Sequence, residues 1–208
     1  SYGMVDLPSG KMKSREGTVV DADDLIATVI NDAREMTEER GHLQSLSLTE
    51  KETLYNTIGL GGLKYYLLRV DPKRGMMFDP KESIDLNGNT GPFIQYTFAR
   101  IQSLLKKAGD RKDIRLDTDL SLIEKKLIIE LLNFPQAINE SGKQLNPSLL
   151  INYTYDLVKQ FNSFYQSVPI LKEVDECTKN MRIELSRMTS VVIANSMRLL
   201  GIDVPTQM

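Results

Sequence analysis

The stretch NPSLLINYTYDLVKQFNSFY, residues 146–165, decides the fold class, because its apolar residues recur at the three- and four-residue steps of an α-helix. Asn146 followed by Pro147 is typical of a helix start, since an Asn side chain caps free amides of the first turn and proline needs no hydrogen-bond partner there. The apolar face consists of Leu150, Tyr153, Leu157, Phe161 and Phe164. This stretch therefore predicts a long amphipathic helix.

Similar helical patterns lie on both sides of it. They begin at Asp21, at Ser47 or Thr49, at Pro92, at Ser121 and before Met181, and they end near Gly41, Leu68, Gly109, Pro135 and Gly201. The last of these helices has an apolar stripe made of Met181, Leu185, Met188, Val192 and Leu199. Strand signals are limited to residues 2–7 and 18–20. The sequence therefore predicts a mainly α fold, an antiparallel helical bundle.

Composition excludes several classes of protein. The chain has 208 residues, 41% of them hydrophobic, which is enough for one large or two small domains with a buried core. No apolar run reaches the length of a membrane span and no secretion signal is present, so we expect a cytoplasmic protein. Cys177, the only cysteine, is predicted to be a small core residue, and His42, the only histidine, a surface residue near a helix end.

Cations are concentrated in two segments, although the net charge of −2 argues against a surface that is basic throughout. Residues 100–115 contain six cations and two anions, a pattern that fits a phosphate-binding stripe and equally a solvated helix end. The segment GKMKSREGT, residues 10–18, holds three cations and a hydroxyl between glycines. Its side chains and freed backbone amides suit a phosphate group, although a solvated basic turn has the same composition.

Three segments, in this order, resemble the arginyl-tRNA synthetases, which are class I aminoacyl-tRNA synthetases. Residues 10–18 are similar to the Lys-Met-Ser-Lys-Ser signature loop, in the form Lys-Met-x-Ser/Thr-Arg. Residues 88–100, GNTGPFIQYTFAR, resemble the family run Gly-Asn-Thr-Ala-Pro-Tyr-x-Gln-Tyr-Ala-x-x-Arg. Residues 197–208, MRLLGIDVPTQM, resemble the usual end of these proteins. The resemblance thus covers nearly the whole chain.

This resemblance implies the C-terminal portion of an enzyme, in three parts. Residues 1–45 would be the end of a Rossmann-type catalytic domain, residues 46–91 a connecting helical region, and residues 92–208 a DALR-type helical anticodon-binding domain. The intact enzyme would use ATP and Mg²⁺ to activate arginine and would then esterify it to tRNA(Arg). We expect a monomer that does not associate with membranes.

Four residues of the signature loop are implied to be catalytic: Lys11, Lys13, Ser14 and Arg15. In the family this loop closes over ATP and stabilises the pyrophosphate leaving group. Ser14 stands where the general class I pattern has a second lysine, and the cations on either side of it would take over that charge. The family's His-x-Gly-His-like segment is not found in this sequence, so we expect the chain alone to bind no cofactor and to be inactive in arginine activation.

Eight residues are predicted to bind tRNA, namely Phe93, Gln95, Tyr96, Arg100, Asn162, Tyr165, Arg182 and Met208. The resemblance implies most of them, and Asn162 and Arg182 are added as polar side chains that could join the same surface. Arg100 can bind a phosphate through two parallel hydrogen bonds, and an exposed tyrosine offers a stacking face for an unpaired base. Tyr165 and Met208 match family positions that contact the anticodon loop. Phe93 replaces the usual tyrosine, and Pro169 stands where some relatives have a second aromatic residue.

Two alternatives remain open at this point. Another class I synthetase, for example the cysteinyl enzyme, also has a helical C-terminal domain, although residues 88–96 disfavour it. A helical protein-interaction module without an RNA role would explain the basic loop by solvation. In that case Phe93 and Phe98 would belong to an aromatic core.

Overall fold

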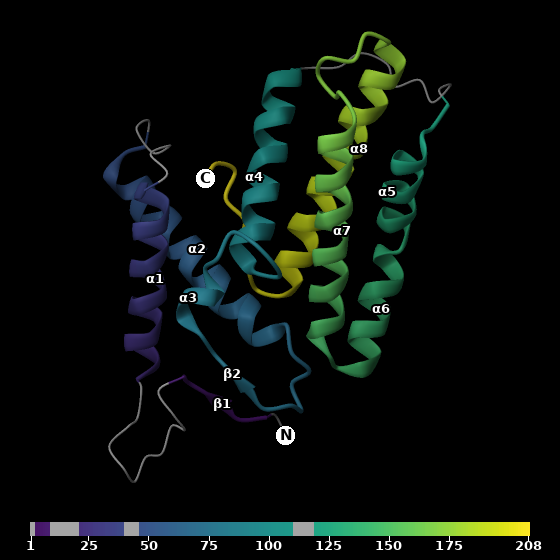
Figure 1. The fold of residues 1–208 in the computed structure, drawn as a ribbon. Coiled ribbons are helices and arrows are strands. Elements are labelled where there is room, and N and C mark those ends of the chain that lie inside the picture. The colour runs from purple at the N-terminus through teal and green to yellow at the C-terminus, as the bar shows by residue number, and fades with distance from the viewer. Residues whose placement is uncertain (1–2, 9–20, 40–45, 110–118) are drawn as a thin grey trace.

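The computed structural model describes residues 3–8, 21–39, 46–109 and 119–208. Within these ranges the chain is almost entirely helical (Figure 1). The elements are β1 (Val5–Asp6), α1 (Ala22–Glu39), α2 (Leu48–Leu68), β2 (Met76–Met77), α3 (Pro80–Ser83), α4 (Gly91–Ala108), α5 (Leu122–Leu132), α6 (Phe134–Gln144), α7 (Pro147–Ser167) and α8 (Glu176–Leu199). The predicted helical fold class is therefore confirmed, and none of these helices is long and apolar enough to cross a membrane.

Figure 1 shows a pair of helices, α1 and α2, beside a bundle formed by α4 to α8. The bundle has one large apolar core that contains, among others, Ile94, Phe98, Phe161, Phe164 and Ile193. Tyr65 of α2 belongs to the same core, so α2 connects the helix pair to the bundle. The two short strands form a parallel pair in which Val5 lies opposite Met76. The strand predicted at residues 2–7 is thus confirmed in part, and the one at 18–20 lies outside the described ranges.

Local signals in the sequence predicted the helix starts correctly. Ser47 and Glu50 form a capping box at α2, and Ser121 and Glu124 form another at α5. Each box satisfies two amides that a helix leaves unpaired at its first turn. At α4, the Thr90 hydroxyl accepts a hydrogen bond from the Phe93 amide, at 3.3 Å. This contact explains part of the 88–100 motif as a helix start.

Glycines of α2 allow α1 and α4 to pack closely against it. A Cβ atom on Gly59 would lie only 2.8 Å from the Cα of Ile30, and one on Gly61 would lie 2.3 Å from the Gln95 side-chain nitrogen. Such approaches are shorter than any normal contact between non-bonded carbon and nitrogen atoms, so a larger residue would force the helices apart. The glycines in α2, which weaken a helix by themselves, therefore serve tertiary packing.

Two sequence predictions about the bundle were wrong in detail. The apolar stripe of the last helix is shifted, since Met188 and Leu199 are exposed and small hydroxyl residues are buried instead, among them Ser186 and Thr189. Their hydroxyls donate to backbone carbonyls four residues earlier, which allows them to be buried between helices. As predicted, the helix that begins at Ser121 ends before Pro135, since α5 ends at Leu132, and Pro135 then lies in the first turn of α6. Cys177 is only partly buried.

Candidate functional site

The segment that follows α8 lies along α2 and α4. The Gln95 side-chain amide donates to the backbone carbonyls of Asp203, at 2.8 Å, and Thr57, at 3.0 Å. The Lys64 ammonium donates to the carbonyl of Gly201, at 2.7 Å. These contacts direct the segment toward the helix pair, where Met208 packs against the apolar cluster around Tyr55. The C-terminus accordingly lies between α1–α2 and α4 in Figure 1.

An open groove of about 870 Å³ lies where this segment meets the bundle. One side is α4, another is the end of α7 with the connection at residues 168–172, and a third is the C-terminal segment at 206–208. Its lining includes Tyr96, Arg100, Lys107, Tyr165, Lys172 and Met208. Three parts of the chain that are remote in sequence thus share one concave surface.

Arg100 lies between two tyrosines in this groove. Its guanidinium carbon is 4.8 Å from the ring centre of Tyr96 and 5.4 Å from that of Tyr165. It also donates a hydrogen bond to the Asn162 side-chain carbonyl, at 3.1 Å, and Asn162 in turn donates to the Thr97 hydroxyl, at 3.3 Å. A cation held against aromatic faces and fixed by a neutral amide keeps its charge available to a ligand.

A second hollow of about 390 Å³ adjoins the first, since Tyr96 and Arg100 line both. Phe93, Lys159 and Asn162 are part of it. The Phe93 ring packs against Tyr155, with their centres 5.8 Å apart. Phe93 therefore lines the second hollow, and part of its ring is covered by Tyr155.

The side chains that line the two hollows are aromatic, apolar, neutral polar or cationic, and none is an Asp or Glu. The cations are Arg100, Lys107, Lys159 and Lys172. Lys159 pairs with Asp156 at 3.9 Å, and the other three form no ion pair with any residue that the structure describes. An aromatic surface with unpaired positive charge is suited to bases and phosphates of an unstacked polynucleotide.

Tyr165 is 38% exposed, which leaves part of its ring accessible beside the Phe161 ring that supports it. The structure thus brings together four of the eight residues predicted to bind tRNA in the groove, Tyr96, Arg100, Tyr165 and Met208, and Asn162 lies in the adjoining hollow. Phe93 lies in the adjoining hollow. The prediction that these residues share one face is consistent with the geometry.

Gln95 does not belong to this surface. Its side chain is 0% exposed and holds α4 to α2 and to the C-terminal segment through the hydrogen bonds given above. A fully buried amide cannot contact tRNA in this conformation, so the prediction of a direct contact is corrected to a structural role. Its side-chain oxygen is buried without a hydrogen-bond partner among the described residues.

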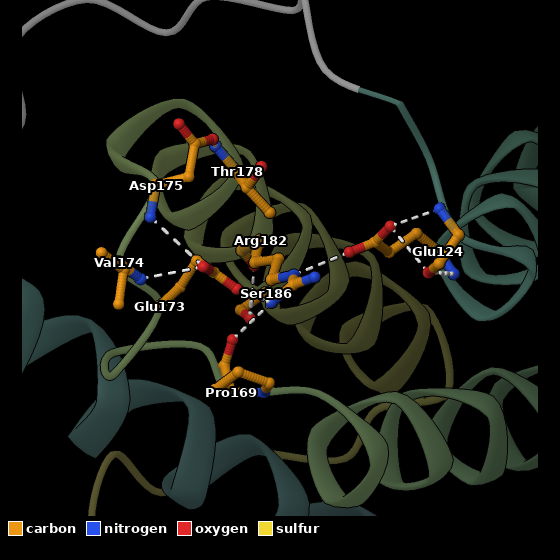
Figure 2. Close-up of polar contacts among 9 residues, drawn as sticks. Glu124, Pro169, Glu173, Val174, Asp175, Thr178, Arg182 and Ser186 are labelled. Carbon is orange, nitrogen blue, oxygen red and sulfur yellow. Dashed lines mark hydrogen bonds and ion pairs between the residues drawn. The ribbon is translucent and has the colours of Figure 1, made fainter.

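Arg182 is also turned away from the groove, and its side chain is 11% exposed. It bonds to Glu124 at 2.7 Å, to Glu173 at 2.5 Å and to the carbonyl oxygen of Pro169 at 2.8 Å (Figure 2). Burial raises the pKa of Glu124, but hydrogen bonds from Arg182 and Ser121 outweigh it, so that the pKa is below its usual value. The prediction that Arg182 contacts tRNA is therefore corrected.

Other predicted residues lie outside the described ranges. These are the four signature-loop residues Lys11, Lys13, Ser14 and Arg15, together with His42 and the part of the basic stripe beyond residue 109. In the described part of the chain, no group of His, Cys, Asp and Glu side chains could hold a metal ion. We therefore place no Mg²⁺ site among these residues.

Sequence reasoning missed Lys172 and the contribution of residues 168–171 to the groove. This connection has no helical or strand periodicity, so no pattern in the sequence predicts where its side chains point. Lys107 belonged to the predicted basic stripe, and the structure places it at the groove. The only signal in the sequence that could have suggested Lys172 is its position, a cation seven residues after Tyr165.

The helical bundle and its aromatic, cationic groove are the features expected of a helical nucleic-acid-binding domain. Residues 94–208, more than half of the chain, match the family model of the DALR anticodon binding domain, and the chain belongs to this family. The predicted family resemblance is thereby confirmed.

Relatives with assigned names agree with this result. The chain is 54% identical over its full length to the arginine–tRNA ligase of Flavobacterium psychrophilum and 49% identical to that of Bacteroides thetaiotaomicron. It spans 35% and 36% of those proteins, about a third of their length. Among solved structures, it superposes with a TM-score of 0.91 and 27% identity on 35% of the arginyl-tRNA synthetase of Thermus thermophilus. The corresponding enzyme of Plasmodium falciparum shares the fold, with a TM-score of 0.81 and 21% identity.

Proposed function

We propose that this chain is the tRNA-binding part of an arginine–tRNA ligase and that its groove binds the anticodon loop of tRNA(Arg). The observation that carries the proposal is the position of Arg100 between Tyr96 and Tyr165, with Met208 in the same groove. Anticodon bases are unstacked, so a protein that recognises them needs aromatic or apolar faces for the bases and cations for the phosphates between them. The groove combines both.

Each residue would have a distinct role. The exposed part of the Tyr165 ring would stack on a base, and the Met208 side chain would cover a base from the opposite wall of the groove. Arg100, Lys107 and Lys172 would contact phosphates, Arg100 by two parallel hydrogen bonds and the lysines as point charges. Asn162 would act by holding the Arg100 guanidinium, since its amide already bonds to both Arg100 and Thr97.

The whole protein would catalyse ATP-dependent attachment of arginine to tRNA(Arg), with Mg²⁺ as the ion that accompanies ATP. Lys11, Lys13, Ser14 and Arg15 would stabilise the pyrophosphate that leaves during arginine activation. We also propose the division into residues 1–45, 46–91 and 92–208. The boundary at residue 92 is supported by the single core that α4 to α8 share, whereas α1 and α2, which lie on either side of the boundary at residue 45, share apolar clusters with each other. A monomeric state and a cytoplasmic location remain predictions.

A binding titration tests the proposal. We expect the 208-residue chain to bind a tRNA(Arg) transcript, with a dissociation constant that rises with salt concentration because phosphate contacts release counterions. Changing the anticodon bases should weaken binding. Equal affinity for both transcripts at every salt concentration would contradict anticodon recognition.

Matched lysines provide the control. Lys172 lies in the groove, whereas Lys125 lies exposed on α5, away from it. Lys172→Ala should lower the slope of log affinity against log salt by about 1, the effect of one lost phosphate contact. Lys125→Ala should leave the slope unchanged.

The alternatives from the sequence are less well supported. The relatives that match the full chain are arginine–tRNA ligases, which favours the arginine enzyme over the cysteinyl one. A protein-interaction module would leave the three groove cations of the described residues without a purpose. Binding of tRNA that does not depend on salt or anticodon would revive that alternative.

A further inference from the structure

The wall of the groove next to Tyr165 has no regular secondary structure. Residues 168–175 connect α7 to α8, and the first five of them, residues 168–172, line the groove. Only Ile170 is buried in the bundle core, while Pro169 and Lys172 are exposed. A connection of this kind has few internal contacts, so its position depends on the residues that hold it from behind.

Arg182 holds this connection from α8. One guanidinium nitrogen donates both to the Pro169 carbonyl oxygen, at 2.8 Å, and to the Glu173 carboxylate, at 2.5 Å. Another donates to the Glu124 carboxylate of α5, at 2.7 Å. Figure 2 shows Arg182 at the centre of these contacts, with Glu124 on one side and Pro169 and Glu173 on the other. A single side chain thus joins α5, α8 and both ends of the groove wall.

Both carboxylates are themselves fixed. Glu124 is 1% exposed, and its second oxygen accepts hydrogen bonds from the amide and hydroxyl of Ser121. Glu173 accepts hydrogen bonds from the amides of Val174 and Asp175, at 2.8 and 3.2 Å, just before α8 begins. The arrangement is therefore a rigid hub, because every partner of Arg182 is anchored to backbone at a helix start or in the wall.

We propose that Arg182 is a positioning residue for the groove: through Pro169 and Glu173 it holds residues 168–172 in place beside Tyr165, so that base and phosphate can be bound together. This inference rests on the proposed function, because it assigns a purpose to the wall in tRNA binding. It also explains why an arginine is needed there. A lysine has the charge but lacks the planar group that can bond to two carboxylates and a carbonyl at once.

Two variants test the proposal in the 208-residue chain. Arg182→Lys preserves the charge, and Glu173→Gln removes one partner at a partly exposed position and remains informative if the first variant fails to fold. Circular dichroism checks that each is folded at the temperature used. For both we expect faster amide hydrogen exchange at residues 168–172 and a dissociation constant for tRNA(Arg) raised about 10-fold, the size of one displaced stacking contact. Affinity for a transcript with a changed anticodon should alter much less.

Arg187→Lys is the matched control. Arg187 lies on the same helix and pairs with Glu184, but its side chain is 43% exposed, and among the described residues it forms no hydrogen bond or ion pair with residues 168–172. Arg187→Lys should leave amide hydrogen exchange at residues 168–172 unchanged, and it should discriminate between the two transcripts as the parent chain does. If the folded variants lose stability but keep the parent's exchange in the wall and its discrimination between transcripts, Arg182 is only structural and the proposal is wrong.

The experiments distinguish an error in the proposed function from an error in the role of Arg182. If the parent chain does not discriminate between anticodons, anticodon recognition is overturned. The exchange rates at residues 168–172 still decide in that case whether Arg182 holds the wall, since this readout needs no RNA. Unchanged exchange in both variants overturns the positioning inference, whatever the binding data show.

Discussion

Replacement of Tyr165 by alanine tests the stacking surface most directly. The ring is 38% exposed, is supported by Phe161 with a centre-to-centre distance of 6.0 Å, and lies 5.4 Å from the Arg100 guanidinium carbon. Loss of a base–aromatic stack weakens binding by about 1–3 kcal/mol. Since 1.4 kcal/mol corresponds to a tenfold change, Tyr165→Ala should raise the dissociation constant for tRNA(Arg) roughly 5- to 150-fold.

Fluorescence anisotropy with a labelled transcript measures this change in the chain itself. Tyr165→Phe is the control, because it preserves the ring face and should stay close to the parent affinity. In a full-length arginine–tRNA ligase with this C-terminal part, Tyr165→Ala should raise KM for tRNA much more than KM for arginine. An unchanged dissociation constant for folded Tyr165→Ala would refute the assignment of Tyr165 to the binding surface.

Two further predictions concern stability. The pKa of Glu124 is below its ordinary value of 4.5, so its interactions stabilise the fold at pH values above about 4.5, and this stabilisation is lost as the pH falls through the lowered value. Glu124→Gln should therefore reduce the free energy of unfolding at pH 7. Urea denaturation should also show that the variant loses less of its free energy of unfolding between pH 7 and pH 3 than the parent chain does. An identical pH dependence in the variant and the parent would contradict this. Gly59→Ala would place a Cβ atom 2.8 Å from the Ile30 backbone and should destabilise the chain by about 1–3 kcal/mol, whereas Gly142→Ala, with open space around it, should stabilise by up to about 1 kcal/mol. Thermal denaturation compares the two, and equal effects would contradict the packing argument.

Helix starts are the features that the sequence predicted best. The capping boxes at Ser47 and Ser121, and the Asn146–Pro147 start of α7, all appear in the structure where the pattern placed them. A cap depends on residues within one turn of each other, so the signal is local. The same holds for the apolar face of α7, because long apolar side chains on one face have to be buried.

The buried face of α8 was not predicted correctly. Ser186 and Thr189 are fully buried, while Leu199 is 58% exposed. Small hydroxyl residues can be buried where a neighbouring helix comes close and their hydroxyls bond within their own helix. Polarity alone therefore misplaced part of the buried face, because α8 packs against three helices, α4, α5 and α7.

The family motifs predicted which residues matter, but not what each one does. Gln95 came from one of these motifs, whereas Arg182 was added as a polar side chain that could join the surface, and both proved to be buried groups that hold other elements in place. Arg182 finds its partners at Glu124 and Glu173, which are 58 and 9 residues away in sequence. No local pattern specifies such a set.

The sequence by itself determined the helical class, the helix starts and the family, because these depend on short-range spacing and on motif order. Only the tertiary structure decided which polar side chains reach the groove and which support it from inside. Tyr165, Arg100 and Met208 come from three separate segments, and their meeting depends on how α4, α7 and the segment after α8 pack together. Whether a side chain is exposed depends on that packing, since one arginine, Arg100, lines the groove while another, Arg182, is buried behind its wall.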